Sequence, residues 1–174
     1  MEKLIVVKFG GSAIGINGEG LPTILERIRR LKEDSKVIVV CSAPLTTING
    51  QKTSLTDVIL SLGKNLANSD VSIDDVAETY SKILEMVNDD YKEECREKIN
   101  DMLMLASKSL KEAKALGRFE DEIRAKALAY SGEVLMSHVL NYVFKSNGIK
   151  SEPVSLDDWP IITDNNIEST NFVF

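Results

Sequence analysis

Histidine, cysteine and long apolar runs are scarce in this chain, and each scarcity excludes a class of function. The 174 residues include one histidine and two cysteines, so a multi-histidine metal site, a zinc cluster and a disulfide framework lack their ligands. The longest apolar runs, such as 37–41, are too short to cross a bilayer. Aromatic residues make up 6% and the net charge is −6, which argues against nucleic-acid binding. We therefore expect a cytoplasmic protein with no membrane segment, no metal ligands and no nucleic-acid partner.

Proline and glycine are also few, with 4 and 10 residues, which excludes collagen-like and low-complexity chains. Hydrophobic residues make up 43% and charged residues 28%, the balance of a globular protein rather than a disordered one. A chain of 174 residues is long enough to bury one sizeable core. We expect a single domain over residues 1–174.

Two short apolar runs predict parallel strands near the start of the chain. Leu4–Val7 and Val37–Cys41 are continuous and rich in β-branched residues, which is typical of strands covered on both faces. Between them, Pro22 stands where a helix begins, and apolar residues recur at helical spacing up to Lys32. This strand–helix–strand order predicts a right-handed crossover and a parallel pair.

Residues 53–147 predict a large helical subregion. Four helices are expected there: one after the capping residue Ser54, one after Ser72, one over 92–116 and one over 120–146. Short strands are expected at 153–156 and 160–163, each opened by a proline. We therefore predict an α/β fold of three layers, α/β/α, with a short, mainly parallel sheet and this helical insertion.

The most informative segment is Lys8-Phe-Gly-Gly-Ser12, at the carboxyl end of the first strand. Ligands of open α/β sheets bind at this end of the strands. Gly10 and Gly11 let a ligand approach the backbone, and Lys8 supplies positive charge for a transferring phosphoryl group. A tight structural turn explains the two glycines equally well. A lysine in a buried strand favours an anionic partner, because a buried charge must be paired.

Two further segments carry polar groups. Glu133 follows Gly132 inside the predicted helix, and its carboxylate can accept a hydrogen bond from a substrate ammonium. A glycine within a helix costs about 1 kcal/mol relative to alanine, so either a ligand approaches closely there or two helices simply pack together. The loop 42–49 is rich in small hydroxyl residues and ends in Asn49, which suits substrate contacts or an ordinary polar turn.

Taken in order, these segments resemble the amino-terminal part of an aspartate kinase, within the amino-acid kinase family. Residues 6–12 match that family's Lys-Phe-Gly-Gly-Thr/Ser signature, and Ser131-Gly-Glu-Val-Leu-Met-Ser137 matches its Ser-Gly-Glu helix. The loop from Ser42 occupies the place of a Ser-Ala segment that ends in Thr-Asn, although Ile48 replaces that threonine. Ile162-Thr-Asp164 fits the family's Thr-Asp segment.

This resemblance implies ATP-dependent phosphorylation of the β-carboxylate of L-aspartate to 4-phospho-L-aspartate, the first step toward lysine, threonine and methionine, with ATP and Mg²⁺ as cofactors. It assigns catalysis and phosphate contact to Lys8, the phosphate path to Gly10, Gly11 and Ser12, and substrate contacts to Thr47, Asn49 and Glu133. It also implies an amino-acid kinase, carbamate kinase-like fold. Residues 1–174 would be its amino-terminal, aspartate-binding lobe, with the nucleotide-binding half and regulatory domains absent and little phosphotransfer by this chain alone.

Two other functions stay open. One is a non-catalytic binding or regulatory module that docks on a kinase partner, and the other is a kinase for a related small carboxylate or phosphate substrate. We expect a homodimer, or association with a chain that carries the nucleotide-binding half, because the edge of an unfinished sheet pairs readily.

Overall fold

The computed structural model describes residues 3–66 and 72–154. It contains the following elements: β1 (Lys3–Phe9), α1 (Gly11–Ile14), α2 (Leu21–Lys32), β2 (Ser35–Cys41), β3 (Leu45–Ile48), β4 (Gln51–Ser54), α3 (Leu55–Lys64), α4 (Asp74–Leu84), α5 (Asp89–Leu116), α6 (Asp121–Ser131) and α7 (Glu133–Ser146). This mixed α/β order, with a short parallel sheet and a large helical part, confirms the predicted fold class. The predicted strand at 160–163, residues 155–156 of the one at 153–156, and the Thr163-Asp164 pair lie outside the described residues, and residues 153–154 are not in a strand.

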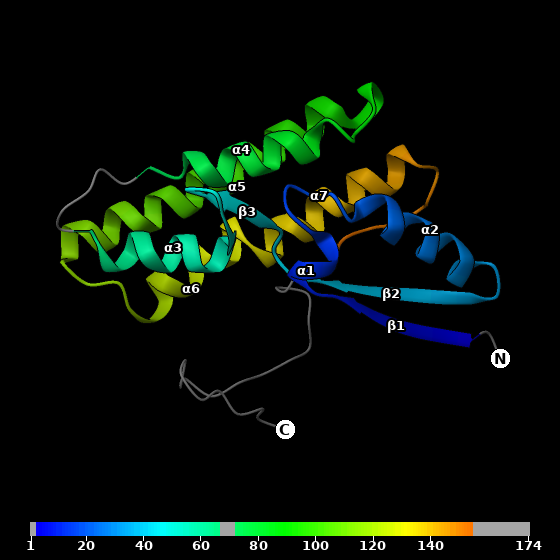
Figure 1. Cartoon of the computed structure of the whole chain (residues 1–174), viewed down its shortest axis with the longest axis horizontal. Helices are drawn as coiled ribbons and strands as arrows, with labels where there is room; N and C mark the ends of the chain where they lie inside the picture. Colours follow the sequence, from blue (N-terminus) through cyan, green and yellow to red (C-terminus); the bar gives the residue numbers. More distant parts are fainter. Residues whose placement is uncertain (1–2, 67–71, 155–174) are drawn as a thin grey trace.

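The parallel strand pair forms as the strand–helix–strand pattern predicts. β1 and β2 pair in parallel, with Lys8 opposite Val40 and Phe9 opposite Cys41. Helices α2 and α7 both contact β2 and lie on the same side of the strand pair (Figure 1). The apolar side chains that alternate toward those helices, Phe9 among them, join the main core.

The opposite face of this strand pair differs from the prediction. In the part of the chain that the structure describes, Leu4, Val6, Ile38 and Val40 are exposed, with Val6 64% accessible. Lys8 is also exposed, so the expectation of a lysine buried in its strand is wrong. The reason is that side chains alternate along a strand while the described helices cover one face only.

Within the helical subregion, α3 and α6 lie at the other end of the molecule from β1 and β2, whereas α7 packs on β2 (Figure 1). Ser54 caps α3 as predicted, since its Oγ accepts a hydrogen bond from the Asp57 N–H at 3.0 Å. Gly117 closes α5 with a positive φ of 65°, the left-handed conformation that glycine adopts without strain. Among residues 3–66 and 72–154, no helix has both the length and the apolar character needed to span a bilayer.

The predicted single helix over 120–146 is wrong, because the structure breaks it at Gly132. Helix α6 ends at Ser131 and α7 begins at Glu133. A β-carbon on Gly132 would lie 2.7 Å from the Leu128 carbonyl oxygen, closer than such atoms can pack. The glycine is therefore required by a turn between two helices, which the continuous helical spacing of apolar residues concealed.

The predicted loop over 42–49 is also wrong in its second half. β3 and β4 form an antiparallel hairpin in which Thr47 pairs with Lys52 and Ile48 with Gln51. Its turn residues, Asn49 and Gly50, have φ values of 50° and 76°. Two successive positive φ values define the two-residue hairpin turn that Asn-Gly favours, so the Asn-Gly pair was the sequence signal for this hairpin.

Candidate functional site

Three segments that are far apart in the sequence meet at the carboxyl ends of β1 and β2. The Ser42 N–H donates to the Phe9 carbonyl oxygen at 2.9 Å, which joins the two strand ends. A β-carbon on Gly11 would lie 2.9 Å from the Ala43 carbonyl oxygen, and one on Gly132 would lie 3.5 Å from the Ala43 β-carbon. Ala43 is therefore packed between the glycine loop and the α6–α7 junction.

The two neighbouring glycines of the loop have different surroundings. Gly11 has no room for a side chain because Ala43 and Leu45 fill the space beside it. Gly10 has no atom within 4 Å of the position of a β-carbon, and the next residue, Ser12, is exposed. The first glycine and the serine thus border open space in which a ligand can lie against the backbone.

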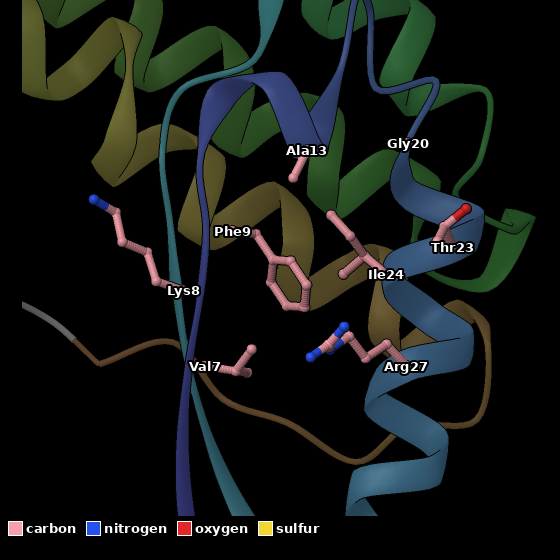
Figure 2. Close-up of a pocket in the computed structure, with 8 residues that line it drawn as sticks. All are labelled: Val7, Lys8, Phe9, Ala13, Gly20, Thr23, Ile24 and Arg27. Carbon is pink, nitrogen blue, oxygen red and sulfur yellow. The ribbon is translucent and has the colours of Figure 1, made fainter.

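Lys8 extends to the opposite side of β1 from Phe9 and Arg27 (Figure 2). Its side chain is exposed, and within the described residues it has no carboxylate partner. The ammonium is therefore available to an anionic ligand at the end of the strand, although it is not buried as the sequence suggested.

A cavity of about 440 Å³ lies between β1 and α2 (Figure 2). It is lined by Val7, Lys8, Phe9, Ala13, Gly20, Thr23, Ile24 and Arg27. Arg27 extends from α2 toward β1, beside Val7 and Phe9 (Figure 2). Most of the lining is apolar, although Lys8, whose side chain extends to the other side of β1, also borders the cavity.

Glu133 is the first residue of α7 and is exposed. A carboxylate in the first turn is favoured there by the partial positive charge of the helix terminus. Burial, together with the nearby negative charge of Glu133, raises the pKa of the Cys41 thiol from 9.0 to about 11. The Glu133 carboxylate at the start of α7 is therefore close enough to the end of β2 for its charge to act on the Cys41 thiol.

Tyr80 of α4 is fully buried beside this junction. Its hydroxyl donates to the carbonyl oxygens of Ser131 at 3.1 Å and of Gly132 at 3.0 Å. Burial, then the proximity of Cys41 and Glu133, raises the pKa of the phenol well above its usual value, so Tyr80 is a neutral hydrogen-bond donor at every physiological pH.

The remaining predicted substrate residues, Thr47 and Asn49, lie on the hairpin. Both are exposed, and Asn49 occupies a turn position with positive φ. Leu45 begins this hairpin beside the glycine loop, where it exchanges hydrogen bonds with Gly15 and Asn17. The structure thus joins the base of the hairpin to the site, while Thr47 and Asn49 stand at its far end.

Sequence reasoning missed the roles of Ala43, Cys41 and Tyr80 in this arrangement. In the sequence, Tyr80 is one of several residues at helical spacing after Ser72, and this spacing does not single it out. A tyrosine among aliphatic residues carries a hydroxyl that needs a partner when it is buried, and that was the available signal. The single histidine, His138, is half-buried within α7, and burial followed by the positive charge of Lys98 lowers its pKa.

Metal ligands do not gather in the described part of the chain. Residues 3–66 and 72–154 hold no group of three or more His, Cys, Asp or Glu side chains that could bind an ion. Both cysteines are free thiols. The polar groups that the described residues bring to this site are the Lys8 ammonium, the Glu133 carboxylate and backbone groups beside the glycines.

A model of the amino acid kinase family matches residues 3–173. No curated protein matches the chain at a significant level.

Proposed function

Because the chain belongs to the amino acid kinase family, we propose that it serves phosphoryl transfer from ATP to a carboxylate and that its substrate is L-aspartate. The observation that carries this proposal is the meeting of three segments at Ala43. The glycine loop after β1, the segment after β2 and the start of α7 come together there, as a site that holds a phosphate and an amino acid at once requires.

The phosphate side of the site is formed by Lys8 and Gly10. In the transfer, a β-carboxylate oxygen attacks the γ-phosphorus, the bond between that phosphorus and the bridging oxygen breaks, and ADP leaves. The Lys8 ammonium stabilises the charge on the phosphoryl oxygens. The open space at Gly10 lets those oxygens approach the backbone.

ATP and Mg²⁺ are implied by the family in general. The residues at the loop fit the phosphate part of the nucleotide, because an unpaired ammonium and a glycine with open space adjoin it. We assign no described residue to Mg²⁺. When bound, this ion neutralises the charge that two anions bring together.

The amino-acid side of the site is formed by Glu133. Its carboxylate is exposed at the first turn of α7 and can accept a charge-assisted hydrogen bond from the α-ammonium of aspartate. Neither Lys8 nor Glu133 is used by an ion pair among the described residues, so both charges are free for a substrate.

The test is a calorimetric titration of the chain with L-aspartate and with N-acetyl-L-aspartate, which lacks the ammonium. We expect the wild-type protein to bind L-aspartate at least about tenfold more tightly than the acetylated compound. Glu133→Ala should abolish this difference. Glu26→Ala removes an exposed carboxylate on α2 and should leave it unchanged.

Two outcomes would contradict the proposal. If neither compound binds the wild-type chain, L-aspartate is not its ligand. If Glu133→Ala still prefers L-aspartate, a group other than Glu133 binds the α-ammonium. A parallel incubation with ATP, Mg²⁺, L-aspartate and hydroxylamine, which traps an acyl phosphate as its hydroxamate, measures the phosphotransfer itself.

A further inference from the structure

The α6–α7 junction is held by a side chain from a distant part of the sequence. Tyr80 stands more than fifty residues before the junction, on α4, and its side chain is fully buried. One phenolic proton is shared between two successive carbonyl oxygens, those of Ser131 and Gly132. A single donor therefore fixes two consecutive peptide groups at the point where the chain changes direction.

One of these carbonyls also sets the start of α7. The Gly132 oxygen accepts the Met136 N–H at 2.9 Å, which is the first hydrogen bond of that helix. Tyr80 thus bonds the same oxygen that begins the helical ladder. Glu133 directly follows Gly132 and lies between it and Met136, so the hydrogen bonds to the Gly132 oxygen fix the backbone that carries Glu133.

The neighbourhood of the hydroxyl links it to the proposed substrate site. Cys41 at the end of β2 and Glu133 are the charged or ionisable groups whose fields reach the phenol. The hydroxyl itself is buried and cannot touch a substrate. It can act on the site only through the backbone that carries Glu133.

We propose that Tyr80 is a positioning residue whose buried hydroxyl, bonded to the Ser131 and Gly132 carbonyls, holds the Glu133 carboxylate where it meets the substrate ammonium. This inference rests on the proposed function for the identity of the substrate. The placement of Glu133 by Tyr80 is a separate claim that needs no ligand.

The variant that tests it is Tyr80→Phe, which keeps the buried ring and removes only the hydroxyl. The matched control is Tyr142→Phe, because the Tyr142 hydroxyl donates to the Glu94 carboxylate at 3.0 Å, away from the junction. We expect Tyr80→Phe to weaken binding of L-aspartate about fivefold to tenfold and to leave binding of N-acetyl-L-aspartate unchanged. Tyr142→Phe should change neither.

A double-mutant cycle shows whether the effect passes through Glu133. In a Glu133→Ala background, Tyr80→Phe should alter L-aspartate binding by less than about twofold. An equal loss with and without Glu133 would overturn the proposal, as would an unchanged affinity in Tyr80→Phe. A Tyr80→Phe chain that no longer folds would also overturn it, since the hydroxyl would then serve the whole fold.

Amide hydrogen exchange at Met136 gives a reading that needs no ligand. Tyr80→Phe should speed exchange of this amide by about fivefold or more, while amides in the middle of α5 keep their wild-type rates. If the wild-type chain binds no L-aspartate, the proposed function fails and the exchange rate alone decides. Faster exchange then supports the placement of Glu133 by Tyr80, and an unchanged rate overturns it.

Discussion

The two faces of the β1–β2 strand pair are built for different tasks. On the face toward α2 and α7, Phe9 and Cys41 pack into the core, and Gly11 and Gly132 have no room for one more carbon atom. On the other face the apolar side chains and Lys8 are exposed. Gly10 likewise adjoins open space.

Residues that pack into the core and residues that are open to a ligand are therefore neighbours in the sequence. Neighbouring positions of a strand point to opposite faces, so Phe9 fixes the end of β1 while Lys8 stays free for a ligand. The same division separates Gly11, which allows close packing, from Gly10, which leaves space. Predictions that change one side and spare the other therefore test the arrangement directly.

The largest expected effect concerns the reactivity of Cys41 on the packed face. A thiol whose pKa is about 11 instead of 9.0 holds about 100-fold less thiolate at neutral pH. Alkylation by iodoacetamide, followed for each cysteine by mass spectrometry, should be correspondingly slow. Its rate should rise about tenfold per pH unit until the pH approaches 11.

The same measurement tests the contact between Cys41 and Glu133. Glu133→Gln removes a negative charge that opposes the thiolate, so the pKa of Cys41 should fall and its alkylation at a fixed pH should quicken. Cys95 is the internal control. Burial, then Glu94, raises the pKa of that thiol to about 12, and Glu133→Gln should leave its rate unchanged. If the alkylation rate of Cys41 does not change in Glu133→Gln, the charge of Glu133 does not act on the Cys41 thiol, and the end of β2 lies farther from the start of α7 than the structure has it.

The next effect is the cost of a methyl group at the junction. Gly132→Ala places a β-carbon against the Leu128 carbonyl oxygen and the Ala43 side chain, so backbone atoms must move. Such overpacking costs about 1–3 kcal/mol, and urea denaturation followed by circular dichroism measures it. A stability equal to that of wild type would show that α6 and α7 are joined more loosely.

Much of this fold could be predicted from the sequence because its signals are local. The two individual strands, the helix that begins at Leu21-Pro22 and the cap at Ser54 each depend on residues within a few positions of one another. The glycine loop was found for the same reason, since Lys8, Gly10 and Gly11 are consecutive or nearly so.

The sequence-based predictions are wrong where contacts between distant parts of the chain decide the conformation. The apolar spacing through residues 120–146 is helical on both sides of Gly132, and only the approach of Ala43 and the hydrogen bonds from Tyr80 reveal the break. The exposure of Lys8 likewise depends on which face the helices cover. A pattern within one strand cannot show that.

A smaller effect compares the two neighbouring glycines of the loop. Gly11→Ala brings a β-carbon to 2.9 Å from the Ala43 carbonyl oxygen and should lower the free energy of unfolding by about 1 kcal/mol. Gly10→Ala meets nothing within 4 Å and should leave stability within about 0.5 kcal/mol of wild type. The same variant should weaken binding of ATP, because the new methyl occupies the space proposed for phosphate. If Gly10→Ala binds ATP as tightly as the wild type does, the phosphate does not lie in the open space at Gly10.

The smallest effect is expected on the exposed face of β1. Val6→Thr keeps a β-branched residue in the strand and changes an exposed side chain, so the free energy of unfolding should move by less than about 0.5 kcal/mol. Val7→Thr places the same hydroxyl on the face that packs against the core, where an unpaired polar group costs about 1–3 kcal/mol. Urea denaturation of the two variants side by side measures the contrast between the faces. If both variants lose the same free energy of unfolding, Val6 is covered in solution as Val7 is. The face of β1 that carries Val6 would then be packed against another layer.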